Sequence, residues 1–168
     1  MKTTQIKKMA VAALLAALAV VLSPFSVPVG ASKCFPIQHM VNVIAGILLG
    51  PWYATGAAFI TSLIRNLLGT GSLLAFPGSM CGAFLAGWLF SKTKKLIAAC
   101  RGEIFGTGII GGLLAYPVAT MVMGKQAAIF AYVVPFLTAT AVGSFMAFML
   151  IGIMEKSGAF RQILKTME

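Results

Sequence analysis

Apolar residues form six long stretches along the chain, and short segments rich in glycine, proline or basic residues separate them. A helix that crosses a bilayer needs about 20 mainly apolar residues, so this pattern predicts six transmembrane helices. We expect them at about 6–22, 36–50, 53–68, 79–90, 103–123 and 128–154. Pro36 suits the first turn of the second helix, and Gly50-Pro51 predicts a tight turn after it. The predicted fold class is an all-α integral membrane protein, with one six-helix domain over residues 1–168.

Basic residues define the expected orientation in the membrane. Ten of the thirteen lie before residue 9, between residues 92 and 101, or after residue 155. Cytoplasmic loops are enriched in Lys and Arg, so we expect the N- and C-termini to be cytoplasmic. A cleaved N-terminal signal peptide is the alternative, but it would leave five helices and place the basic tail outside the cell. Three segments are then outer loops: 23–35, 69–78 and 124–126.

Composition supports a membrane protein and removes other classes. Hydrophobic residues make up 60% of the 168 positions and charged residues 10%, and the mean hydropathy is +0.98, as in polytopic membrane proteins. The net charge of +10 does not indicate nucleic acid, because the basic residues flank apolar stretches, where they set topology and contact anionic lipid. The three cysteines lack the spacing of a metal site or a disulfide, so we expect no metal.

Polar side chains inside the apolar stretches fall toward the expected outer side of the membrane. With one neighbouring phenylalanine they form the candidate substrate-binding set: His39, Asn42, Arg65, Asn66, Tyr116, Thr120, Tyr132 and Phe136. Polar groups in hydrocarbon are costly, and a pocket or pathway is the usual reason for them. Members that are three or four residues apart, such as His39 and Asn42, share a helix face.

Less specific interpretations stay open for these residues. Asn42 and Asn66 also fit hydrogen bonds between two helices without any ligand. Arg65 lies near a helix end, from which its charge can reach the membrane surface. The tyrosines also fit the aromatic belt at the membrane interface.

The positions of the acidic residues indicate how transport by this protein would be driven. Glu103, Glu155 and Glu168 are the only three, and we expect all of them at the inner surface, outside the candidate site. Ion-coupled transporters usually carry Asp or Glu within the membrane. The chain also lacks a phosphate loop of the Gly-Lys-Ser/Thr kind. If the protein transports, its energy comes from another subunit.

Two further patterns concern helix packing. Residues 106–111 match the dinucleotide-binding pattern Gly-x-Gly-x-x-Gly, but no strand precedes them, so Gly108 and Gly112 are better explained by close helix packing. The first helix carries alanines four apart: Ala12, Ala13, Ala16 and Ala17. This surface fits either packing within the chain or docking onto a separate membrane protein. No set of nucleophile, base and acid is present, so we expect neither an enzyme nor a cofactor.

Six short spans, the alanine-rich first helix, the basic inner face and the missing ATPase motif together resemble the S components of energy-coupling factor (ECF) vitamin transporters. The resemblance covers essentially the whole chain, and residues 33–83 are its specific part. Within them, residues 33–42, 50–53, 65–71 and 76–79 are similar to the ThiW family, S components for the thiazole precursor of thiamine, hydroxyethylthiazole.

This resemblance implies a multi-pass protein of a prokaryotic cell membrane that binds its ligand at the outer side. It would dock through the first helix onto a transmembrane coupling subunit served by two cytoplasmic ATPases, and deliver the ligand by toppling. Two alternatives stay open. One is an S component for another thiamine-related compound or vitamin, and the other is a self-sufficient facilitator for a small solute.

Overall fold

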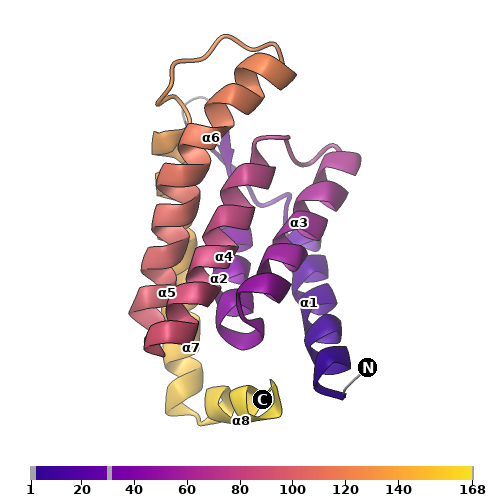
Figure 1. The fold of residues 1–168 in the computed structure, drawn as a ribbon, viewed down its shortest axis with the longest axis vertical. Helices are drawn as coiled ribbons and strands as arrows, with labels where there is room; N and C mark the ends of the chain where they lie inside the picture. The colour runs from indigo at the N-terminus through magenta and orange to yellow at the C-terminus, as the bar shows by residue number, and fades with distance from the viewer. Residues whose placement is uncertain (1–2, 30–31, 168) are drawn as a thin grey trace.

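The computed structural model describes residues 3–29 and 32–167, so Glu168 lies outside the described residues. Its helices run side by side as a bundle (Figure 1). The separate helices are α1 Thr3–Val21, α2 Pro36–Leu49, α3 Pro51–Leu67, α4 Ala75–Thr93, α7 Val133–Lys156 and α8 Ala159–Met167. One continuous helical rod lies between α4 and α7 and comprises α5 Leu96–Glu103, η1 Ile104–Gly111, α6 Gly112–Pro117 and η2 Val118–Val122.

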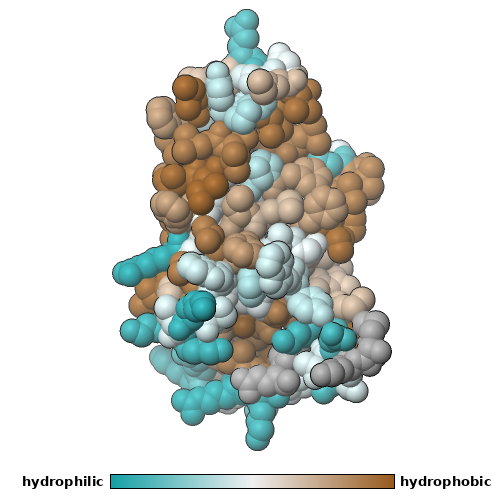
Figure 2. Space-filling view, in the orientation of Figure 1, coloured by the Kyte–Doolittle hydropathy of each residue, from teal (hydrophilic) through white to brown (hydrophobic). Residues whose placement is uncertain are grey.

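The two ends of the bundle differ in chemistry. Both described ends of the chain and the short helix α8 lie at the lower end (Figure 1). Lys8, Gly50, Lys94 and Leu164 line one hollow there, which brings the turns after α2 and α4 to the same end. Hydrophilic side chains gather around this end, whereas the surface above it is mainly apolar (Figure 2). Which side of the membrane this end faces stays a prediction.

Three helices are long and apolar enough to cross a membrane, among the residues that the structure describes: Thr3–Val21, Leu96–Val122 and Val133–Lys156. α2 is apolar but shorter, with 14 residues. The protein is thus a helical membrane protein, and the count of six spans stays a prediction.

Several helix boundaries differ from those predicted. The segment 92–102, expected to be a loop, is helical except for Lys94 and Lys95. Lys and Arg are good helix formers, so their charge alone did not mark a break. The break comes at Lys94, whose φ of 55° is left-handed. α4 also begins earlier than expected, at Ala75. Pro77 then falls in the first turn of the helix, where proline is tolerated because backbone N–H groups there have no partner within the helix.

Two elements were not predicted. The segment expected to be the first outer loop contains an antiparallel hairpin, β1 Val27–Val29 with β2 Ser32–Cys34, in which Pro28 pairs with Lys33. The amphipathic helix α8 follows α7, and its Phe160 is buried against the lower core. α7 itself begins at Val133 rather than near residue 128.

Small residues let the helices approach closely, as predicted for η1 and α6. A Cβ added to Gly112 would lie 2.8 Å from the Cα of Val133 on α7, and one added to Gly108 would overlap Leu137. α4 occupies the centre of the bundle, packed against α2, α3, α5 and η1. A Cβ on Gly46 of α2 would lie 2.7 Å from the backbone nitrogen of Gly87 on α4. This central position of α4 makes it one wall of the candidate site.

Candidate ligand-binding site

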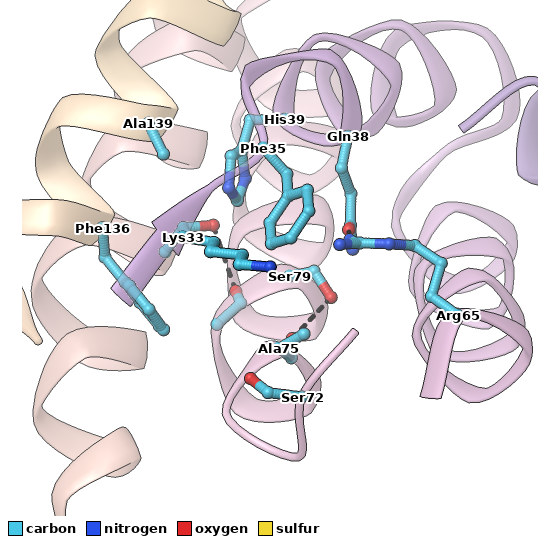
Figure 3. Close-up of a pocket in the computed structure, with 12 residues that line it drawn as sticks. Lys33, Phe35, Gln38, His39, Arg65, Ser72, Ala75, Ser79, Phe136 and Ala139 are labelled. Atoms are coloured by element: carbon cyan, nitrogen blue, oxygen red, sulfur yellow. Dashed lines mark hydrogen bonds between the residues drawn. The ribbon is translucent and has the colours of Figure 1, made fainter. Parts of the chain in front are cut away.

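A cavity opens at the end of the bundle opposite the termini, between α2, α3, α4, η1 and α7 (Figure 3). Its lining consists of Lys33, Phe35, Gln38, His39, Arg65, Ser72, Ala75, Gly78, Ser79, Thr107, Phe136 and Ala139. The cavity volume is about 30 Å³. The cavity is therefore contracted, with room for about two waters in the present state.

The roof of the cavity comes from the hairpin. β2 carries Lys33, and Phe35 follows it just before α2 begins. The thiol of Cys34 is buried and donates a hydrogen bond to the carbonyl oxygen of Pro135 on α7, at 3.0 Å. Burial raises the pKa of this thiol, which keeps it protonated and able to donate. The hairpin is thus tied to α7 directly above the cavity.

Arg65 forms the cationic side of the cavity. Its side chain comes from the last turn of α3 and is completely buried, so it does not reach for the membrane surface. One terminal nitrogen donates to Gln38 Oε1, and the other donates to the carbonyl oxygen of Thr70 at 3.2 Å. The ring of Phe35 lies against the guanidinium, with its centroid 3.7 Å from Cζ. Arg65 Nε is buried without a hydrogen-bond partner.

Glu103 lies at the base of the site, and here the sequence prediction was wrong. Its carboxylate is fully buried, and Oε1 accepts hydrogen bonds from His39 Nδ1 at 2.9 Å, Asn42 Nδ2 at 3.1 Å and Thr107 Oγ1 at 2.9 Å. We had expected Glu103 at the inner surface because the helix was thought to begin there. The helix begins at Leu96, so Glu103 is carried roughly 10 Å along its axis into the bundle.

This contact determines how His39 can meet a ligand. An ionised carboxylate only accepts hydrogen bonds, so with Glu103 ionised His39 Nδ1 carries the proton of this contact. His39 also lines the cavity, which leaves Nε2 as its other polar atom for a bound molecule. A neutral ring would accept a hydrogen bond at Nε2, and a protonated ring would donate one.

Hydroxyl and amide groups connect the helices around the cavity. Gln38 Nε2 donates to Ser62 Oγ at 3.4 Å, and Ser62 shares a hydrogen bond with Ser79 Oγ at 3.0 Å. Asn42 Nδ2 lies 3.3 Å from the carbonyl oxygen of Ser79. These bonds join α2, α3 and α4 and hold the polar walls in fixed positions.

The structure brings three of the predicted substrate-binding residues to the cavity wall: His39, Arg65 and Phe136. Asn42 lies beneath the wall, held by Glu103 and Ser79. Asn66 also lies outside it, and its amide donates to the carbonyl oxygens of Ser62 and Ser72.

The other three predicted residues lie away from the cavity lining. Thr120 donates to the carbonyl oxygen of Tyr116 within its own helix, at 3.0 Å. Tyr132 is buried in an apolar cluster with Leu74 and Ala115, and its ring centroid lies 6.4 Å from that of Phe136. It therefore supports the aromatic wall from behind.

Several lining residues were not in the predicted set: Lys33, Phe35, Gln38, Ser72, Ser79 and Thr107. One signal for them was available, because Gln38 is four residues before Asn42 and shares its helix face. Lys33 and Phe35 could not be placed without the hairpin that folds them over the cavity.

A second hollow lies on the apolar surface between α1 and α3. Its volume is about 550 Å³, and its walls include all four predicted docking alanines together with Trp52 and Ile60. Ala13 and Ala17 are exposed in this groove, whereas Ala16 is 3% exposed and packs inward. The alanine surface of α1 thus has one side inside the bundle and one side open.

An apolar helical bundle with a small polar cavity at one end defines a membrane protein suited to holding a small solute. The family described as thiamine-precursor transporter protein (ThiW) matches residues 9–157, and the chain belongs to this family. The fold is similar to that of ThiT from Listeria monocytogenes, with a TM-score of 0.60 and 20% identity over 95% of this chain and 98% of that chain. No curated protein matches the chain.

These findings confirm the resemblance to S components of the ThiW family drawn from residues 33–83. They support a membrane transport role in the uptake of a thiamine-related compound. The family is one of transporters and not a class of enzymes.

Proposed function

We propose that the protein is the substrate-binding S component of an ECF importer for the thiazole precursor of thiamine, hydroxyethylthiazole or a closely related thiazole. The observation that carries this proposal is the match to the thiamine-precursor transporter family over residues 9–157. The cavity gives it a physical basis, because a flat heteroaromatic ring needs aromatic walls and a few directed hydrogen bonds.

Residues of the cavity suit such a ligand. Phe35 and Phe136 offer ring faces on two sides, and His39 Nε2 can bond to a ring or side-chain atom of the ligand. Asn42 acts from beneath by fixing Glu103, which in turn orients His39. Asn66 braces the loop that carries Ser72. Tyr132 supports Phe136, whereas Tyr116 and Thr120 have no direct part in this proposal.

The membrane arrangement belongs to the same proposal. Six spans with both termini in the cytoplasm would place the cavity on the outer side of a prokaryotic cell membrane. The open groove between α1 and α3 would receive the transmembrane coupling subunit, which two cytoplasmic ATPases drive. Exposed Ala13 and Ala17 in the groove support this role, since small side chains permit close helix approach.

Two measurements test the proposed function. Mass spectrometry of the small molecule that copurifies with the protein should identify a thiazole. Uptake of labelled hydroxyethylthiazole by cells should require this chain and also the coupling subunit and both ATPases. Uptake that persists when the ATPases are inactivated would favour a self-sufficient facilitator, and a different copurified vitamin would favour an S component of other specificity.

A further inference from the structure

Arg65 is a buried cation without a neutralising carboxylate. Its side chain has no exposed surface, and its hydrogen-bond partners are the neutral oxygens of Gln38 and Thr70. The described contacts of Arg65 are with Gln38, Thr70 and the ring of Phe35, and none of them is with a carboxylate. A buried charge is strongly destabilising unless an opposite charge and hydrogen bonds compensate it. The compensation here is incomplete.

The unpaired nitrogen belongs to a residue of the cavity wall. Arg65 lines the cavity, and its Nε is fully buried with no partner. A guanidinium presents its N–H groups in a rigid fork that matches the oxygens of a carboxylate or phosphate. A guanidinium in the cavity wall that has no carboxylate partner and one unpaired N–H is therefore suited to an oxyanion.

A second cation lies over the same space. Lys33 lines the cavity, and in the view of Figure 3 its side chain extends toward the guanidinium of Arg65. Both side chains are positive, so an anion bound between them would be attracted by both. Ser72 and Ser79 also line the cavity and can add hydroxyl donors.

The opposite side of the cavity has a different character. There Glu103 Oε1 accepts hydrogen bonds from Asn42 and Thr107 and pairs with His39, its Oε2 is buried without a partner, and Phe136 lines the cavity with an aromatic ring. In Figure 3 Phe136 lies on one side of the cavity and Arg65 on the other, and the side chain of Lys33 extends between them from the hairpin. A ligand that matches both sides has a flat ring at one end and a negative charge at the other.

We propose that the ligand of this site is a thiazole whose side chain carries an oxyanion, a carboxylate or a phosphate monoester, seated against Arg65 and Lys33. The inference rests on the proposed function for the thiazole ring, while the anionic group follows from the charges of the cavity. It differs from neutral hydroxyethylthiazole, which leaves Arg65 without a counter-charge.

Calorimetry on the purified full chain tests the inference with three probes: hydroxyethylthiazole, its phosphate ester, and the analogue with a carboxylate in place of the alcohol. We expect at least one anionic probe to bind ten-fold or more tightly than the alcohol. Which anion is preferred then identifies the oxyanion. Equal or tighter binding of the alcohol would overturn the inference and leave the proposed function intact.

Substitutions of Lys33 and Arg65 test whether these two cations cause the preference for an anionic thiazole over the alcohol. Lys33→Gln and Arg65→Gln should each reduce the preference for the anion about ten-fold or more, with little change for the alcohol. Lys125→Gln removes an exposed charge from the same end of the bundle and should change nothing. Lys33 is on the surface hairpin, so its variant stays informative even if Arg65→Gln does not fold. A preference that survives in the folded variants would contradict the inference.

A melting series separates this inference from the thiazole assignment. Inorganic phosphate at constant ionic strength should raise the melting temperature of the wild-type protein, and the Lys33→Gln variant should show a smaller rise. If phosphate stabilises the protein but no thiazole binds, the proposed function fails and the anion site stands. If phosphate has no effect and the anionic thiazoles do not bind, the anion site is wrong.

Discussion

The imidazole of His39 and the carboxylate of Glu103 meet inside the bundle, with Nδ1 2.9 Å from Oε1, although 64 residues separate them in the chain. Glu103 has no exposed surface, and the same oxygen also accepts hydrogen bonds from Asn42 and Thr107. A single carboxylate oxygen therefore organises α2 and η1 around the base of the cavity. The first prediction concerns this contact.

Glu103→Ala should lower the stability of the protein by about 3 kcal/mol or more, because it removes the acceptor of His39 Nδ1 and the charged acceptor that Asn42 and Thr107 share. Asn42 and Thr107 would keep only the carbonyl oxygens of Ser79 and Gly78 as acceptors. Thermal melting in detergent measures the change. Glu155→Ala is the control, since Glu155 is exposed on α7 and its loss should stay within about 0.5 kcal/mol. Equal melting temperatures for both variants would contradict a structural role for Glu103.

His39→Ala and Asn42→Ala should each weaken ligand binding by about 1–3 kcal/mol, roughly five- to 150-fold. His39 would lose a direct contact, whereas Asn42 would act only through the orientation of Glu103 and His39. Calorimetry on purified variants gives the affinities, with Gln162→Ala on exposed α8 as the control. Unchanged affinity in both variants would move the binding site away from α2.

Single cysteines on a cysteine-free background test the orientation in the membrane. Position 125 should react with an impermeant reagent added to intact cells, and position 94 should react only after permeabilisation. Both lysines are exposed, so a difference in labelling reports the side of the membrane and not burial. Labelling of position 94 in intact cells would place the cavity at the cytoplasmic side.

Larger side chains should have different effects on the two sides of the alanine surface of α1. Ala13→Leu fills the open groove and should weaken copurification with the coupling subunit while ligand affinity stays the same. Ala16→Leu inserts into a packed position and should destabilise the chain itself, by about 1–3 kcal/mol. Normal copurification and uptake by Ala13→Leu would show that the groove is not the docking surface.

Much of the fold follows from local pattern. The apolar stretches and the Gly50-Pro51 turn predicted the helices and their order, since each signal acts within a few residues. The helix ends near 92–102 were predicted poorly, because Lys94 interrupts the helix through one left-handed residue rather than through composition. Likewise α8 is short and mixed in composition, and only its packing through Phe160 shows its role.

The candidate site was predicted in part for the same reason. His39, Arg65 and Phe136 could be found because polar or aromatic side chains at the outer helix ends are few. Glu103 was misplaced because its position depends on where a helix starts seven residues earlier. Lys33 and Phe35 reach the cavity only through the hairpin pairing, a contact between segments that no helical spacing describes.

The contracted cavity sets a kinetic condition on ligand exchange. Space for about two water molecules does not hold a thiazole, so entry requires the residues that line the cavity to move apart. Release requires the same movement, so its rate limits the residence time of the ligand. A ligand enclosed in this way dissociates slowly even when its equilibrium affinity is modest.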